Sequence, residues 1–148
     1  MEAISKILMY ETSLKWDFDL SNGTISSGTR MPLLVGPPPE FNGTFNVWSP
    51  EHLLVAAINS CYATTFLSFA KMLHVSVERL NVSAKVEFEK REHGFEATKF
   101  IITPVIEFQI LPDQHTLDNL FARTKKYCFI SNSVKGEIIV EPRIINKN

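Results

Sequence analysis

The residues best suited to chemistry in this chain are its two cysteines. Cys61 lies inside a long apolar segment, and Cys128 follows a short basic stretch. If the fold brings the two sulfur atoms together, one thiolate can attack a peroxide oxygen and become a sulfenic acid. The second thiol then condenses with that sulfenic acid to form a disulfide. The alternative is that both are unreactive core residues, which is common for free buried cysteines.

Attack on a peroxide requires a thiolate, so something must lower the pKa of Cys61. The dipole of a helix cannot do this, because Cys61 lies well beyond the first turn of the helix predicted below. A cation from another segment is therefore expected beside the sulfur. The candidates are basic side chains that could equally be ordinary surface charges: Arg30, Lys15, Arg123, Lys125 and Lys126.

Other kinds of site have no support in the sequence. No two histidines have the spacing of metal ligands on a helix. A glycine-rich phosphate loop and a Gly-x-Ser-x-Gly motif are both absent. We therefore expect no metal and no organic cofactor. The four histidines are His52, His74, His93 and His115.

The composition is that of a globular protein. Of the 148 residues, 45% are hydrophobic and 21% are charged, and the net charge is -1. We expect one domain over residues 1–148 and, without a basic excess, no nucleic-acid partner. The first ten residues lack the pattern of a signal peptide, and no apolar run approaches the roughly 18 residues that span a membrane. These features predict a cytoplasmic protein with reduced thiols and no membrane partner.

The elements that must position the cysteines follow from the hydropathy pattern. Residues 10–20 alternate apolar and polar side chains, which predicts a strand, and weaker strands are expected from Thr24 and over 31–35. A Ser-Pro pair is typical of a helix start, and the helix predicted over 51–73 is apolar around most of its circumference. Such a helix must be buried on nearly all sides, and a partner subunit could cover one of them.

The second half of the chain contains the remaining elements. Alternation over 82–89 and 98–110 indicates two strands of an antiparallel hairpin. A second helix is expected from Asp113, with a break near Cys128, and a last strand over 138–144. This order of elements predicts an α+β fold.

Two motifs resemble those of the OsmC/Ohr family. Residues 49–61 read Ser-Pro-Glu-His-Leu-Leu-Val-Ala-Ala-Ile-Asn-Ser-Cys, which is similar to the family helix Pro-Glu-x-Leu…Ala-Ala…Cys. Residues 128–132 read Cys-Phe-Ile-Ser-Asn, which is similar to the family motif Cys-Pro-x-Ser-Asn. Both motifs occur in the family's order within a matching pattern of elements, so the resemblance covers nearly the whole chain.

The resemblance implies an OsmC-like intertwined homodimer, in which a long central helix from each chain is wrapped by antiparallel sheets. It also implies a thiol-dependent peroxidase that reduces organic hydroperoxides, in preference to or alongside hydrogen peroxide, with an external dithiol as reductant. Cys61 would be the peroxidatic residue and Cys128 the resolving residue. Glu51 would help to orient an arginine at the site.

Helix geometry constrains the part that Glu51 can take. Ten residues separate Glu51 from Cys61, which corresponds to about 15 Å along a helix and about 80° around its axis. The two side chains therefore cannot touch within one straight helix. If both serve one site, Glu51 acts through its long side chain or comes from the partner subunit, which favours a site at a dimer interface.

The chain departs from the family pattern at two places. Phe129 replaces the proline that would fix the backbone after the resolving thiol. Glu40 stands where one branch of the family carries an arginine, and near the first strands, where the other branch has its arginine, this chain has Lys15. A carboxylate beside Cys61 would raise the pKa of that thiol.

Two other functions stay open on the sequence. The chain could be a non-catalytic module that binds a small thiol-bearing or acyl-bearing molecule in a dimer-interface pocket. It could also be a structural dimer with inert cysteines. Phe66, Phe69 and Phe129 could contribute to the walls of a pocket, although core packing is the more common role of such residues.

Overall fold

The computed structural model describes residues 6–18 and 20–145 of the chain. These residues form two compact units, over residues 1–53 and 54–148, and each unit is described by itself. The long helix α1 runs across the boundary. The expectation of a single domain over residues 1–148 stays a prediction.

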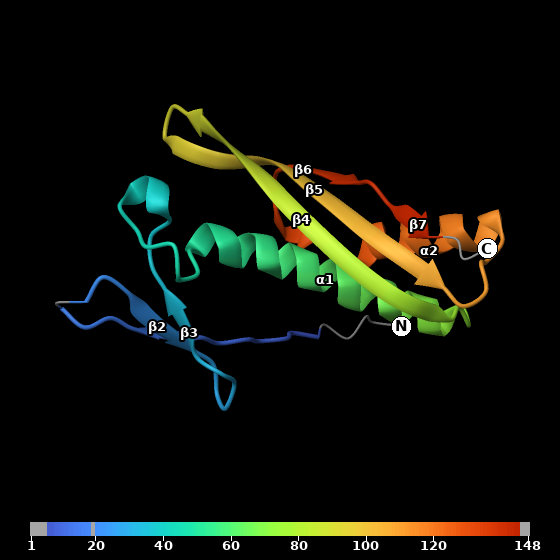
Figure 1. The fold of residues 1–148 in the computed structure, drawn as a ribbon, viewed down its shortest axis with the longest axis horizontal. Coiled ribbons are helices and arrows are strands. Elements are labelled where there is room, and N and C mark those ends of the chain that lie inside the picture. The colour runs from blue at the N-terminus through green and yellow to red at the C-terminus, as the bar shows by residue number, and fades with distance from the viewer. Residues whose placement is uncertain (1–5, 19, 146–148) are drawn as a thin grey trace. The chain divides into compact units, whose positions relative to one another are not determined.

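The N-terminal unit is a small antiparallel sheet followed by a short 3-10 helix. Its strands β1 (Ser13–Lys15), β2 (Gly23–Ser26) and β3 (Leu33–Val35) are paired in that order, and η1 (Pro39–Phe41) follows (Figure 1). β1 is much shorter than the strand predicted over 10–20, of which Asp19 lies outside the described residues. The apolar side chains of residues 10–20 are exposed. A longer strand therefore has no surface within the chain against which it could be stabilised.

Helix α1 (Pro50–Met72) begins and ends at clear local signals. Ser49 caps its start, because the Ser49 hydroxyl accepts a hydrogen bond from the backbone N–H of His52 at 3.2 Å. At the other end His74 takes a left-handed conformation with φ 57°, and the N–H of Val75 bonds to the carbonyl of Ala70 at 2.8 Å. The predicted helix is confirmed with nearly the predicted bounds.

The C-terminal unit is built on a long hairpin. Strands β4 (Val77–Arg91) and β5 (Gly94–Phe108) are antiparallel, as the alternation predicts, and each is longer than expected. Strands β6 (Glu137–Val140) and β7 (Arg143–Ile145) both pair with β5 in parallel. The sheet is therefore mixed: it contains the predicted antiparallel hairpin and two parallel pairings, and the predicted α+β fold class is confirmed. The helical connection between β5 and β6 carries the chain back to the middle of β5, where β6 pairs with residues 99–102 in parallel.

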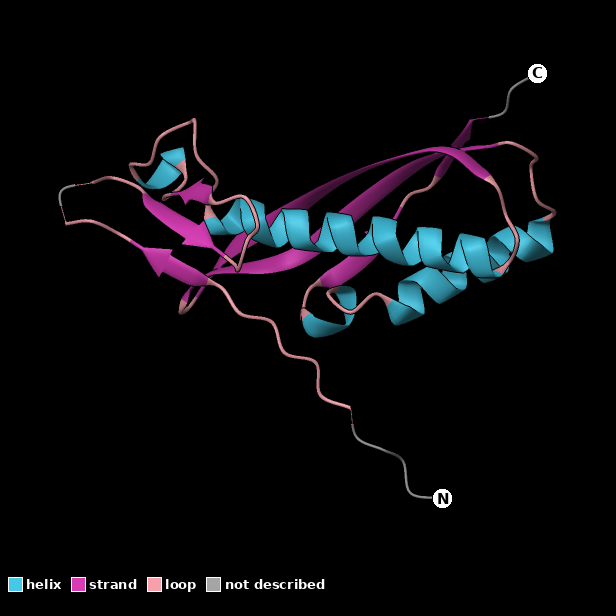
Figure 2. Ribbon diagram, turned by 90° about the horizontal axis from the view of Figure 1, so that it is seen from below, coloured by secondary structure: helices cyan, strands magenta, loops and turns pink. Residues whose placement is uncertain are grey.

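Helix α2 (Gln114–Tyr127) forms most of that connection and lies beside α1 on one face of the sheet (Figure 2). It is capped by Asp113, whose carboxylate accepts a hydrogen bond from the N–H of Thr116 at 2.8 Å. A short 3-10 helix, η2 (Ser131–Ser133), follows after a break at Cys128, as predicted.

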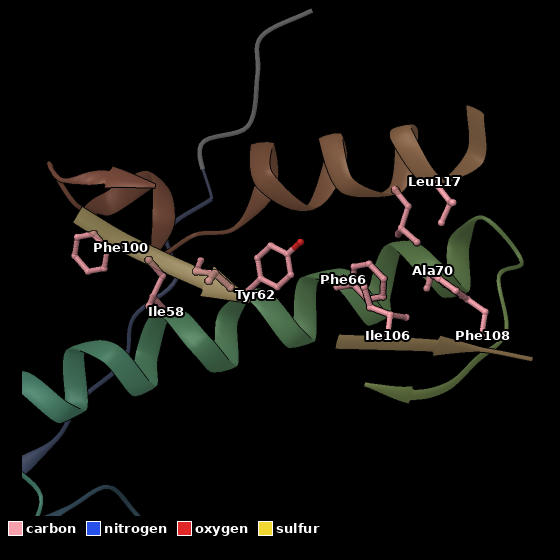
Figure 3. Close-up of a cluster of buried hydrophobic side chains, with 10 residues drawn as sticks. Ile58, Tyr62, Phe66, Ala70, Phe100, Ile106, Phe108 and Leu117 are labelled. Carbon is pink, nitrogen blue, oxygen red and sulfur yellow. The ribbon is translucent and has the colours of Figure 1, made fainter. Parts of the chain in front are cut away.

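The core of the C-terminal unit fills the space between α1, α2 and β5 (Figure 3). From α1 it takes a stripe of residues spaced by four, which is one face of a helix. The rest of the helix is only partly covered, in contrast to the burial on nearly all sides that its composition predicts. The buried stripe is Ile58, Tyr62, Phe66 and Ala70.

Helix α1 also corrects the expectation about membrane-spanning segments. Over its 23 residues it is long and apolar enough to cross a membrane, by length and composition only. The run 53–70 contains no charged residue, although serine, threonine and asparagine interrupt its apolar side chains. Core helices have the same properties, so length and composition alone do not make α1 a membrane span.

Candidate active site

The two cysteines lie side by side in the C-terminal unit, although 67 positions separate them in the sequence. The thiol of Cys128 donates a hydrogen bond to the sulfur of Cys61, and the two Sγ atoms are 3.0 Å apart. Both cysteines are reduced in this structure. Cys61 is partly buried in the middle of α1, whereas Cys128 is fully buried at the C-terminal end of α2.

The packing of α2 against α1 brings the two sulfurs together. Thr124 and Leu120, about one and two turns before Cys128, are fully buried, and the Thr124 hydroxyl donates a hydrogen bond to the Leu120 carbonyl at 2.8 Å. The rings of Phe69 on α1 and Tyr127 on α2 lie 5.5 Å apart between centroids. These contacts fix the end of α2 over the middle and C-terminal half of α1.

The turn after Cys128 is held by its own side chains. The N–H of Asn132 donates to the carbonyl of Cys128 at 3.1 Å, and its side-chain amide donates to the carbonyl of Lys126 at 2.9 Å. The Ser133 hydroxyl donates to the carbonyl of Phe129 at 2.7 Å. Asn132 of the second motif and Ser133, which follows it, therefore hold the backbone around Cys128.

The surroundings shift the pKa values of the two thiols in opposite directions. For Cys61, burial opposes ionisation, but hydrogen bonds from the Cys128 thiol, the N–H groups of Ile130 and Phe129 and the Thr65 hydroxyl together lower its pKa. For Cys128, burial and the hydrogen bond that it donates to Cys61 raise its pKa, and contacts with Ser131 offset this only in part. Cys61 is thus the more acidic thiol of the pair, and Cys128 is the less acidic one.

The groups that lower the pKa of Cys61 are neutral donors, and no cation of residues 54–145 is among them. Arg123 instead bonds to the side chain of Asn119 at 3.0 Å and lies over the Phe69 ring. Lys126 lies over the ring of Tyr127, 5.2 Å from its centroid. The candidates Arg30 and Lys15 belong to the N-terminal unit, so their predicted role at Cys61 stays a prediction.

Two acidic residues singled out in the sequence also lie in the N-terminal unit. Glu51 is in the first turn of α1 and is not a partner of either thiol. Its Oε2 atom is buried, and among the described residues no hydrogen-bond partner satisfies it. Glu40 is an exposed residue of η1. The predicted function of Glu51 stays a prediction.

A groove lies between the C-terminal half of α1 and α2. Its volume is about 580 Å³. Of the predicted pocket residues, Phe69 lines this groove, Phe66 belongs to the core, and Phe129 is 66% exposed. The groove combines aromatic and sulfur-containing walls with two cations. Its lining residues are Phe69, Met72, Ala122, Arg123, Lys126 and Tyr127.

Sequence reasoning missed the neutral donors. Thr65 has a signal, because it lies four residues after Cys61 and therefore on the same face of the helix; its hydroxyl is 4.0 Å from the Cys61 sulfur. The N–H groups of Phe129 and Ile130 have no side-chain signal at all. Among the described residues no cluster of three or more metal-ligating side chains occurs.

The OsmC-like protein family model matches residues 43–143. An OsmC-like protein of unknown function from Vibrio cholerae is 23% identical, with a TM-score of 0.84 over 94% of this chain and 100% of that one. An OsmC-like protein from Mycoplasma pneumoniae is 14% identical, with a TM-score of 0.79 over 94% and 99%.

A third solved structure has a functional name. It is an organic hydroperoxide resistance protein from Elizabethkingia anophelis, which is 19% identical, with a TM-score of 0.75 over 97% of this chain and 100% of that one. No curated protein matches the sequence. At these identities the solved structures show that the fold is shared. Since the family model matches well over half of the chain, the protein belongs to the OsmC-like family.

Proposed function

We propose that the protein is a thiol-dependent peroxidase that reduces organic hydroperoxides through a cycle of Cys61 and Cys128. The observation that carries the proposal is the contact of the two sulfurs at 3.0 Å, with Cys61 as hydrogen-bond acceptor and Cys128 as donor. The pKa of Cys61 is lowered and that of Cys128 is raised, which suits a nucleophile and a proton donor.

The first step is attack of the Cys61 thiolate on the hydroxyl oxygen of the hydroperoxide. The O–O bond breaks, Cys61 becomes a sulfenic acid and the alkoxide leaves. The buried thiol of Cys128 is the acid next to this reaction, so it supplies the proton that converts the alkoxide to an alcohol. Cys61 is oxidised by two electrons, and the hydroperoxide is reduced by two.

The second step uses the Cys128 thiolate formed by that proton transfer. It attacks the Cys61 sulfur, an S–S bond forms, and hydroxide leaves and is protonated to water. A disulfide has an S–S distance of about 2.05 Å, so the sulfurs must approach by roughly 1 Å. An external dithiol then reduces the disulfide by two electrons and is itself oxidised.

The proposed enzyme is a homodimer. The first strand region exposes large apolar side chains, including Leu14 at 57% and Trp16 at 44%, and α1 is buried along one stripe only. A second copy would cover such surfaces. It could also bring a cation to the buried Oε2 of Glu51, which has no partner among the described residues. Burying a carboxylate oxygen without a partner is costly, so an additional group is expected there.

The cellular setting follows from the chemistry. The cycle starts from two free thiols, which a reducing compartment maintains. We therefore propose a cytoplasmic location, and no metal or organic cofactor is needed for the steps above. The function in the name of the E. anophelis protein, organic hydroperoxide resistance, agrees with this proposal.

Mass spectrometry of the treated protein tests the function. Reduced protein receives a few equivalents of an organic hydroperoxide, beside the Cys128→Ser variant. The proposal expects rapid loss of two hydrogens from the wild type, mapped to a Cys61–Cys128 disulfide, and a trapped sulfenic acid on Cys61 in the variant. Free thiols that persist in excess peroxide, although denaturant exposes both to alkylation, would contradict it.

A non-catalytic binding module is the second candidate, and the groove between α1 and α2 favours it. Arg123 and Lys126 form no ion pair within the described part of the chain, and their neighbours Phe69 and Tyr127 are aromatic. An acyl-bearing ligand with an anionic end would suit such walls. Native mass spectrometry of the purified protein separates the two functions, because a binder retains a ligand and consumes no peroxide.

A further inference from the structure

We propose that the groove between α1 and α2 is a binding site for an alkyl carboxylate, whose anionic end is held by Arg123 and Lys126. Both side chains line the groove, and the other lining residues supply mainly apolar surface. The inference goes beyond the proposed peroxidase, because neither cysteine is among the lining residues. The site therefore binds its ligand whether or not Cys61 reacts with a peroxide.

The positive charge at this end of α2 has no carboxylate partner within the described part of the chain. The ion pairs there involve other residues. Residues 119–127 contain three basic side chains and no acidic one. The acidic residues at the start of α2 are engaged elsewhere, since Asp113 caps the helix and Asp118 accepts a hydrogen bond from Gln114 at 2.8 Å. The groove is therefore complementary in charge to an anion.

Neutral groups hold the Arg123 guanidinium at the groove. Its Nε atom donates to the Asn119 side chain at 3.0 Å, and its Nη1 atom donates to the Met72 sulfur at 3.6 Å. The guanidinium carbon lies 5.9 Å from the centroid of the Phe69 ring. These partners fix the position of the cation without neutralising its charge. A ligand that meets a cation fixed in this way loses less binding free energy to the ordering of side chains.

The second cation belongs to the same face of the helix. Lys126 follows Arg123 by three residues, so the two side chains are neighbours on the surface of α2. The Lys126 amino group lies 5.2 Å from the centroid of the Tyr127 ring. The dipole of α2 favours basic residues throughout its last turn, but of Lys125 and Lys126 only Lys126 lines the groove. Two neighbouring cations suit one shared anionic group.

The apolar walls indicate what the rest of the ligand must be. Met72 is 60% exposed and Tyr127 is 49% exposed, so large apolar surfaces face the solvent beside the two cations. The groove volume of about 580 Å³ lies within the range of small-molecule sites, roughly 300–1,000 Å³. An alkyl chain that covers these walls gains the free energy of burying apolar surface.

Helix polarity favours a carboxylate over a phosphate as the anionic group. Phosphate sites commonly use the N-terminal ends of helices, where backbone N–H groups point at the ligand. This groove is formed by the C-terminal halves of α1 and α2, whose ends carry partial negative charge. A singly charged carboxylate meets less repulsion there than a phosphate, and it can bind both cations.

Titration calorimetry with octanoate tests the site in the reduced full-length protein, without any peroxide. Arg123→Gln and Lys126→Gln remove the two cations, and Lys125→Gln is the matched control that removes the same charge outside the groove. We expect octanoate to bind roughly fivefold more weakly to each groove variant, as for the loss of one partly exposed ion pair, and equally well to the control. Acetate and 1-octanol, which lack the chain or the charge, should bind more weakly than octanoate.

Two results of this titration would overturn the inference. The first is that octanoate fails to bind the wild type. The second is an equal loss of affinity in all three variants, which would mean that only net charge matters. Circular dichroism verifies that the variants are folded. Sedimentation is measured as well, because a wild-type dimer that dissociates in Arg123→Gln would show that a second copy occupies the groove, and this would also overturn the inference.

A second measurement needs no substitution in the binding assay. In protein labelled with ¹³C at the methionine methyl groups, octanoate should shift the Met72 resonance, and Met31, which does not line the groove, is the reference. Octanoate binding that leaves the Met72 resonance unchanged would overturn the inference. Wild-type protein that binds octanoate in the groove but consumes no hydroperoxide would refute the proposed peroxidase alone.

Discussion

Closing the Cys61–Cys128 disulfide should stabilise the protein substantially. The bond joins residues 67 positions apart, and the sulfurs already lie at 3.0 Å in the reduced protein. A cross-link over a loop of this length lowers the entropy of the unfolded chain by an amount worth about 4 kcal/mol. The approach of roughly 1 Å that the bond requires is small, so little of this should be lost to strain in the native state.

The effect can be measured by thermal unfolding. For a chain of this size each kcal/mol changes the melting temperature by about 3 °C, so the oxidised protein should melt roughly 10 °C above the reduced protein. The oxidised sample is prepared with one equivalent of hydroperoxide, and peptide mapping verifies that the bond lies within one chain. The Cys128→Ser variant receives the same treatment and should show no such increase.

One outcome would refute the reasoning. If the mapped intramolecular disulfide is complete and the melting temperature stays the same or falls, forming the bond must distort the native packing. The contact of the two sulfurs in the reduced protein would then not allow the disulfide to form without strain. A disulfide found only between two chains would lead to the same conclusion about the geometry.

Three further predictions follow from particular residues. Iodoacetamide at neutral pH should modify Cys61 well before Cys128, because the pKa of Cys61 is lowered and that of Cys128 raised; equal labelling, read by peptide mapping, would contradict this. Phe66→Ala should lower the free energy of unfolding by about 3–5 kcal/mol in urea, since this side chain is fully buried. Phe129→Ala, as its exposed control, should change that free energy by only about 0.5 kcal/mol. Ser49→Ala removes the cap of α1 and should cost about 1 kcal/mol in the same assay; an unchanged value would mean that the cap contributes nothing.

Local signals were enough to predict several elements from the sequence. The Ser49 cap and the proline after it mark the start of α1, and the alternation in β4 and β5 marks the hairpin. The break of α2 at Cys128 was also expected. These features depend on residues close together in the chain, so a pattern of side chains can reveal them.

Non-local pairing was harder to predict. The first strand carries a clear alternation yet extends over Ser13–Lys15 only, because its apolar face has no cover within the chain. Strands β6 and β7 join β5 in parallel, which depends on where α2 returns the chain and not on their own residues. The sequence likewise does not reveal that α1 is buried along one stripe only, because this depends on how the rest of the chain packs against the helix.

For the site, the sequence by itself determined which groups can do chemistry, namely the two thiols. The motifs around them also indicated that the two thiols act together. The tertiary structure decided that Cys61 and Cys128 meet, since the packing of α2 on α1 brings together positions 67 apart. It also decided which neutral groups lower the pKa of Cys61. The physical reason is that every residue except proline carries a backbone N–H, so only the path of the chain determines which of them faces the sulfur.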